Sequence, residues 1–273
     1  MARGRTTSGQ RRAWAAAIAA AVAGLSMAVG RGGDSRAVEP EPPPSTSATA
    51  EPPPGTSSST STPSTSLAGG PIAARLAALP IKGRAPMTGY DRALFGQAWS
   101  DAPRVSGGRN GCDQRNDVLR RDLDPVEIKP GTNGCVAIAG ELLDPYSGTS
   151  LDFERGPRSA EVPVDHVVPL GNAWATGAQQ ITSEQREALA NDPLNLQPTS
   201  RSLNAQKSDG DAATWLPPAK TYRCTYVSRQ IEVKVRYRLW VTAPEKKAME
   251  RVLSGCPDQR LDPAKWDVPQ VSR

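Results

Sequence analysis

Residues 34–66 contain almost no side chain that a hydrophobic core could use. Proline, serine, threonine and glutamate dominate this stretch, as in residues 39–47 (EPEPPPSTS) and 51–60 (EPPPGTSSST). A segment with so little apolar surface cannot offset the entropy of ordering, so we expect residues 31–70 to form an extended, disordered linker. The folded part is then residues 71–273, which at about 200 residues is long enough for one sizeable core.

Residues 1–30 are predicted to be a secretory signal peptide. An arginine-rich flank precedes a 17-residue apolar run at residues 13–29, and small residues end that run. This order is typical of a signal peptide. The alternative is an uncleaved membrane anchor, although the run is short for a bilayer span. We therefore expect a secreted or envelope-associated protein with no stable membrane span after cleavage.

All four cysteines of the chain lie in the predicted folded part, at Cys112, Cys135, Cys224 and Cys256. An even number of cysteines in an exported domain predicts two disulfides, for which three pairings exist. Sequence proximity favours Cys112–Cys135 and Cys224–Cys256. A zinc site fits these residues less well, because no pair has Cys-x-x-Cys spacing and the one histidine is distant.

Net charge is a weak guide to the partner of this chain. The formal charge is +5, and residues 71–273 carry 27 basic and 24 acidic side chains. A mildly basic domain is compatible with a polyanionic substrate but does not require one.

The chain contains a single histidine, His166. Because imidazole gains or loses a proton near neutral pH, imidazole acid–base chemistry in this chain must use that residue. The alternative is an ordinary strand histidine with a satisfied ring. If His166 is a general base, its usual pKa predicts that activity falls as the pH drops through about 6–7.

Two short strands are predicted around this histidine, at residues 150–154 and 161–168. Phe153 and the alternating apolar positions of the second segment support a hairpin, and residues 155–160 between them are rich in turn formers. We therefore expect these two strands to pair with each other and to present His166.

A short helix is predicted after Thr199 or Ser200, either of which is suited to cap it. Asn204 and Lys207 are three residues apart and project from one face of that helix. The hairpin and the helix form a ββα arrangement that could bring the Asp165 carboxylate and the Asn204 amide oxygen together. Such oxygen ligands suit Mg²⁺, Mn²⁺ or Ca²⁺. We expect Mg²⁺, because two protein ligands leave positions for phosphate oxygens and water.

The ordered motifs resemble the HNH (ββα-metal) endonuclease superfamily. The core of the resemblance is residues 165–170 (DHVVPL), then Asn195, then residues 204–209 (NAQKSD). Further segments extend it to about residues 76–256 and are most similar to a secreted HNH family related to the C-terminal nuclease domain of GmrSD restriction enzymes. These segments are residues 90–99 (YDRALFGQAW), 110–119 (NGCDQRNDVL), 143–148 (LDPYSG), 190–196 (ANDPLNL) and 215–218 (WLPP).

The resemblance implies an α+β fold with a ββα-metal core surrounded by further helices, and it implies a role for each core residue. Asp165 and Asn204 would ligate the metal, and His166 would be the general base. Asn195 would hold the loop that bears the histidine or orient its ring. Lys207 would meet a substrate phosphate. The final H in the name HNH stands for a histidine, and Asn204 occupies the corresponding position in this sequence.

Arg115 lies near the start of a predicted helix that follows Cys112. Its planar guanidinium could bind a substrate phosphate, and a structural ion pair with Asp117 or another carboxylate is the competing interpretation. Trp174 and Trp215 are interpreted as core residues rather than as platforms for bases.

Three further helices are expected along the chain. Residues 183–190 are predicted to form a surface helix. Residues 222–241 alternate like a strand but also repeat every four residues, and the resemblance favours a helix, with Lys234 on a solvated face. Another helix is expected to start near Thr242, with capping-box spacing to Glu245, and to run to about residue 253.

The function expected from these observations is metal-dependent hydrolysis of phosphodiester bonds in DNA, with RNA as a further candidate. Low sequence specificity is expected, because the sequence has no recognition helix, zinc finger or repeat. A non-catalytic envelope protein that keeps the fold for binding is one alternative, and a hydrolase of another envelope polymer is a second. We expect a monomer whose partner is its nucleic acid substrate.

Overall fold

The computed structural model describes residues 71–269, so the expectations for residues 1–30 and 31–70 lie outside the described part. The fold is α+β, as predicted. The helices are α1 (Ile72–Ala78), α2 (Gln114–Asp122), α3 (Leu170–Ala175), α4 (Ser183–Asn191), α5 (Arg201–Lys207), α6 (Arg223–Arg236) and α7 (Ala243–Leu253). The strands are β1 (Leu123–Ile128), β2 (Ala137–Asp144), β3 (Thr149–Glu154), β4 (Val164–His166) and β5 (Leu196–Pro198).

The strands form two small antiparallel sheets, and the predicted hairpin is wrong in its pairing. β3 pairs with β2 in the three-stranded sheet β1-β2-β3, while β4 pairs with β5, so that His166 lies opposite Leu196. The physical reason is local: residues 145–148 form a tight turn between β2 and β3, and Gly148 takes its positive φ of 76°. Closing such a short loop costs little entropy, so β2 is the nearer partner for β3.

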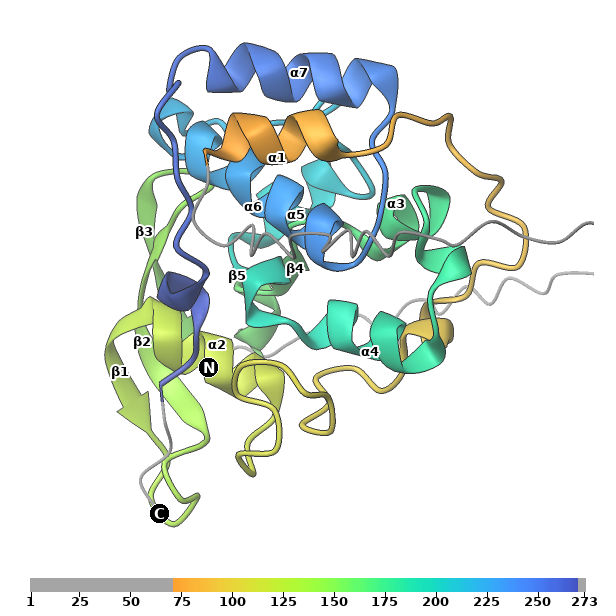
Figure 1. The fold of residues 1–273 in the computed structure, drawn as a ribbon. Helices are drawn as coiled ribbons and strands as arrows, with labels where there is room; N and C mark the ends of the chain where they lie inside the picture. The colour runs from red at the N-terminus through yellow and green to blue at the C-terminus, as the bar shows by residue number, and fades with distance from the viewer. Residues whose placement is uncertain (1–70, 270–273) are drawn as a thin grey trace, which may run out of the picture. The chain divides into compact units, whose positions relative to one another are not determined.

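The ββα arrangement is built from β4, β5 and α5. Figure 1 shows these three elements close together in the middle of the domain. α3 and α4 are inserted between the two strands, while α5 follows β5 almost directly. Ser200 caps α5 by accepting a hydrogen bond from the Leu203 N–H, one of the two caps predicted. The second strand of the core is therefore β5, which the sequence did not predict.

α6 is the central helix of the main core. α1 and α7 pack on it, and Figure 1 shows both of them above it. α7 begins with the predicted capping box between Thr242 and Glu245. The helices predicted within residues 222–241, 242–253 and 183–190 are confirmed as α6, α7 and α4, and Trp174 and Trp215 pack in or against the hydrophobic clusters as expected.

Lys234 corrects the prediction of a solvated basic face on α6. Its side chain is fully buried, and its Nζ lies 2.9 Å from a carboxylate oxygen of Glu245, which is also fully buried. Asn172 and the Trp240 carbonyl accept further hydrogen bonds from the same amine. A buried ammonium is tolerated here because a carboxylate and several oxygens surround it.

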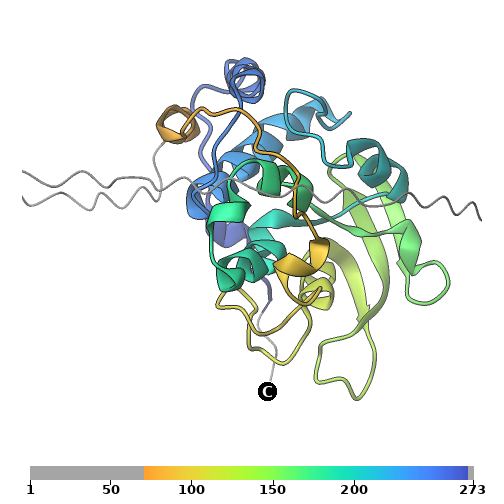
Figure 2. The ribbon, with the colours of Figure 1, turned by 90° about the vertical axis from the view of Figure 1, so that its right-hand side faces the viewer.

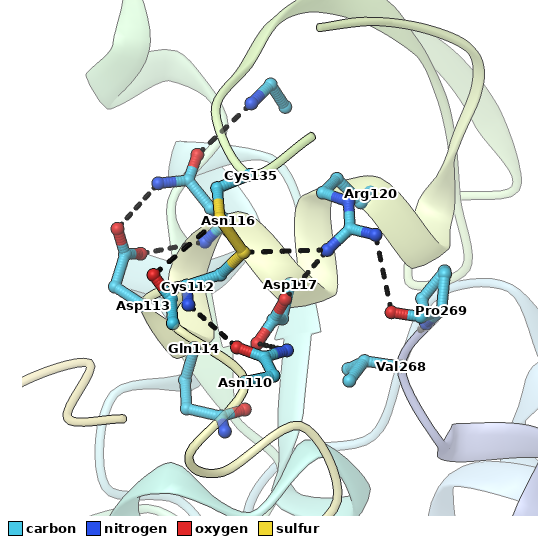
Figure 3. Close-up of polar contacts among 12 residues, drawn as sticks. Asn110, Cys112, Asp113, Gln114, Asn116, Asp117, Arg120, Cys135, Val268 and Pro269 are labelled. Atoms are coloured by element: carbon cyan, nitrogen blue, oxygen red, sulfur yellow. Dashed lines mark hydrogen bonds and ion pairs between the residues drawn. A yellow bond between two sulfur atoms is a disulfide. The ribbon is translucent and has the colours of Figure 1, made fainter. Parts of the chain in front are cut away.

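Both predicted disulfides are confirmed. Cys112–Cys135 ties the residue before the α2 cap to the loop that leads into β2, and Cys224–Cys256 ties the start of α6 to the segment after α7. Figure 3 shows the first bridge beside the N-terminal end of α2. Among residues 71–269, no helix has the length and apolar character that a bilayer crossing requires.

Candidate active site

His166 is buried at the end of β4, with 7% of its surface exposed. Its Nε2 lies 2.9 Å from the Ala190 carbonyl oxygen at the end of α4. A carbonyl oxygen only accepts hydrogen bonds, so in the neutral ring Nε2 carries the proton and donates it. This leaves Nδ1 as the nitrogen that can accept a proton.

The surroundings of the imidazole disfavour its protonated form. Burial, followed by the positive charges of Arg92 and Lys207, lowers the pKa of His166 from 6.5 to about 3, although the hydrogen bond to Ala190 works in the other direction. The Trp99 ring stacks on the imidazole with a centroid distance of 6.1 Å and an interplanar angle of 9°. The ring is therefore neutral over the whole neutral range, and in the metal-free protein the same lowered pKa makes it a weaker base than a free imidazole.

Asp165, the residue before the histidine, is held by two buried side chains. Tyr146 donates its hydroxyl to one carboxylate oxygen at 2.7 Å, and Lys207 Nζ lies 2.9 and 3.0 Å from the two oxygens. Lys207 also donates to the His166 backbone carbonyl at 2.7 Å. The lysine of α5 thus joins the helix to both residues of β4.

Lys207 is buried and bonded within the protein, unlike an exposed lysine that is free to bind a substrate phosphate. It is 1% exposed, and both acceptors of its amine belong to the protein. Burial lowers the pKa of Lys207, and the Asp165 carboxylate counteracts that effect. In this arrangement the amine neutralises Asp165.

Asn195 holds the backbone that follows the histidine. Its Oδ1 accepts a hydrogen bond from the Val168 N–H at 2.8 Å, and its Nδ2 donates to the Leu189 carbonyl at 3.1 Å. The side chain is fully buried. It ties the loop after β4 to α4, the helix whose Ala190 carbonyl fixes the imidazole.

A hard divalent cation fits the donor chemistry of Asp165 and Asn204, with one condition on charge. Asn204 is half-buried, and its side chain has no hydrogen bond within residues 71–269. It lies three residues before Lys207 on α5, and among residues 71–269 no hydrogen bond joins its side chain to Asp165. The described residues contain no group of three or more His, Cys, Asp or Glu side chains suited to a metal. A cation at Asp165 would require Lys207 to release the carboxylate, because the amine lies 2.9 and 3.0 Å from its two oxygens.

Arg115 lies on α2 and bonds to the backbone before β4. Its guanidinium donates to the carbonyls of Ser159 and Val162 at 3.2 and 3.1 Å. Burial lowers its pKa. The ion pair considered for it with Asp117 is absent from the described residues, because Asp117 pairs with Arg120 at 3.0 Å (Figure 3).

Asp144 and Tyr146 are two site residues that sequence reasoning missed. Both are fully buried in and after β2, and Asp144 accepts hydrogen bonds from the Tyr146 N–H at 3.0 Å and the Thr199 hydroxyl at 2.7 Å. The pair therefore connects the first sheet to the start of α5 and to Asp165. Residues 143–148 are one of the segments that carry the family resemblance, and this was the signal available for them.

Two arginines support the backbone on either side of Asn195. Arg229 of α6, which is fully buried, donates to the Leu194 and Leu196 carbonyls at 3.0 Å each. Arg121 of α2 donates to the Leu196 carbonyl at 3.0 Å. Both guanidinium groups lie against the ring of Trp266, at 3.8 and 5.5 Å from its centroid. No sequence pattern pointed to these contacts, because they join segments far apart in the chain.

A pocket of about 250 Å³ opens beside the imidazole. Residues 92, 93 and 95–99, which come from the short 3-10 helix η1 (Arg92–Phe95) and the segment after it, form one wall. His166, Leu170 and Ala190 form the other wall, and more of the lining is apolar than polar. The candidate base therefore faces a small concave site.

Comparison with known proteins gives a family match over the site. Residues 113–252 match the family described as GmrSD restriction endonucleases, C-terminal domain. An "Uncharacterized secreted protein" of Arthroderma benhamiae is 36% identical over 183 residues, which cover 66% of this chain and 82% of that protein. No solved structure matches the chain. The site residues from Arg115 to Lys207 lie inside the matched range, whereas the pocket wall at 92–99 precedes it.

Proposed function

The chain belongs to the family of GmrSD restriction endonuclease C-terminal domains, and from this premise we propose that it is a secreted, metal-dependent endonuclease of the HNH type. The proposed reaction is hydrolysis of phosphodiester bonds in DNA, with RNA as the second substrate to test. One observation carries the proposal: the only imidazole of the chain is buried and neutral, and its Nε2 is held by Ala190.

In the proposed reaction, Nδ1 of His166 accepts the proton of the attacking water. The hydrogen bond from Nε2 to Ala190 fixes the ring, and Asn195 fixes the loop that follows it. Asp165 and Asn204 would hold a divalent cation, with Mg²⁺ expected. When bound, such a cation supplies charge stabilisation at the phosphorus and the leaving oxygen.

Lys207 has a different role in this proposal from the phosphate contact expected from the sequence. Its amine balances the Asp165 carboxylate, as the distances of 2.9 and 3.0 Å support. A buried carboxylate without a partner would be costly, so the lysine stabilises the metal-free protein. Arg115 is proposed to position the segment before β4 through its two carbonyl contacts.

A plasmid-nicking assay tests the proposed function. The secreted protein is incubated with supercoiled DNA in Mg²⁺, in Mn²⁺ and in EDTA, together with His166→Ala and the exposed-site control Lys247→Ala. Loss of a general base predicts a rate about 10²–10⁴-fold lower for His166→Ala, with the control unchanged. If wild type and His166→Ala leave DNA equally intact in every metal, the protein is not the nuclease proposed. The non-catalytic binding protein then becomes the better account.

A further inference from the structure

We propose that the pocket beside His166 is a subsite for one unstacked nucleotide, so that the enzyme acts on single-stranded or locally unpaired nucleic acid. The base would enter the pocket, and the adjoining phosphate would bind the guanidinium of Arg92. This inference rests on the proposed function and names the substrate class of the same site.

The first support is the size and lining of the pocket. Its volume of about 250 Å³ lies just below the roughly 300–1,000 Å³ of sites for drug-sized ligands. A single planar ring system suits such a space, whereas a stacked base pair does not. Phe95, Leu170 and Ala190 make much of the wall apolar. A base would thus leave water for an apolar, concave surface, as bases do in proteins that act on extruded nucleotides.

The second support is Arg92, which lies at the same pocket. Its side chain is exposed and forms no hydrogen bond or ion pair with other residues of 71–269. A guanidinium without a protein partner, close to the candidate base, suits a phosphate of the bound strand.

The third support is the backbone that forms the wall. Trp99 has a φ of +60°, which is uncommon for a bulky residue, and Gly96 has a φ of +76°. Asp91 caps η1 by accepting a hydrogen bond from the Ala93 N–H at 2.8 Å, and the Trp99 carbonyl accepts one from the Gln114 N–H at 3.3 Å. The loop is therefore held so that the half-buried Trp99 lies over His166 and beside the pocket, where aromatic rings commonly stack on bases.

Binding in EDTA tests the subsite apart from catalysis. The secreted protein is labelled at histidine. NMR then follows its single imidazole signal while ligands are added. The ligands are thymidine trinucleotide, an abasic trinucleotide with the same phosphates, and a short blunt duplex. We expect the abasic ligand to bind roughly 5- to 150-fold more weakly than the trinucleotide, because it lacks the stacked base. The blunt duplex is expected to bind more weakly as well.

Variants assign the binding to the pocket. Ala93→Phe fills the space, and Arg92→Gln removes the charge; each is expected to weaken trinucleotide binding, while the exposed-site control Arg104→Gln leaves it unchanged. In cleavage assays, wild type should cut single-stranded DNA faster than duplex DNA, and Ala93→Phe should reduce that preference. Equal binding of base-containing and abasic ligands, or full binding by Ala93→Phe, overturns the subsite. If the trinucleotide binds as expected but wild type cuts no DNA, the subsite stands and the nuclease proposal fails.

Discussion

The protonation of His166 can be followed without overlap from other imidazoles, because the chain has no other histidine. The residue is 7% exposed, and its Nε2 is hydrogen-bonded to the Ala190 carbonyl. Burial and the charges of Arg92 and Lys207 lower its pKa to about 3. In metal-free protein the imidazole should therefore remain neutral from about pH 8 to about pH 4.5, far below its ordinary midpoint near 6.5.

The sign and size of the effect on stability follow from linkage. The unfolded chain binds the imidazole proton near pH 6.5, whereas the folded chain binds it only near pH 3. The stability that the neutral ring contributes is therefore complete above about pH 6.5 and is lost as the pH falls toward 3. At pH 5 the loss from His166 should be about 2 kcal/mol, and below pH 3 it should approach about 5 kcal/mol.

Urea unfolding at about pH 8 and about pH 5, in EDTA, measures this loss when wild type is compared with His166→Gln. The comparison is needed because Asp117 acts in the opposite direction. Burial raises the pKa of Asp117 to about 6, so protonation of that carboxyl favours the folded state as the pH falls. Asp117 is present in both proteins, so its contribution cancels in the difference.

The imidazole NMR signal provides the direct check. A midpoint near pH 6.5 in the folded, metal-free protein would refute the reasoning, and so would equal pH dependence of stability in wild type and His166→Gln. This titration describes the metal-free protein, so the fall of activity through about pH 6–7 stays the prediction for the metal-loaded enzyme.

Three other predictions concern buried groups and the disulfides. Lys207→Met should destabilise the metal-free protein by about 3–5 kcal/mol, because Asp165 loses its buried counter-ion. In a double-mutant cycle, adding Asp165→Asn should restore part of that loss. If the two losses in unfolding free energy simply add, the pairing is contradicted. Asp117→Asn should abolish a stability gain of about 1–2 kcal/mol that the raised pKa of about 6 predicts between pH 7 and 5; unfolding in urea at both pH values measures it, and an unchanged gain would show that another group is responsible. Removing the Cys224–Cys256 bridge, whose cysteines are 32 residues apart, should cost about 3–4 kcal/mol; a shift in the urea midpoint of Cys224→Ala/Cys256→Ala reports it, and no shift would mean that the loop is already restricted in the unfolded chain.

Local signals in the chain were sufficient for much of the fold. The capping box at Thr242, the four-residue repeat of α6 and the cap at Ser200 depend on residues within one or two helical turns of each other, so they can be recognised without the rest of the molecule. The disulfide pairing followed from proximity along the chain. The order of Asp165, His166 and Asn204 was visible in the same way, as was the α+β class.

Folding decided the features that depend on distant segments. β4 pairs with β5 rather than with β3, because β2 is within reach of β3 through a four-residue turn while Leu196 returns to His166 after two helices. Burial, which no local pattern encodes, placed Lys207 on Asp165 and lowered the pKa of His166. The residues of 92–99 reach the histidine from some seventy positions upstream. Such contacts depend on competition among partners for the same core, and that competition is resolved only when the whole chain packs.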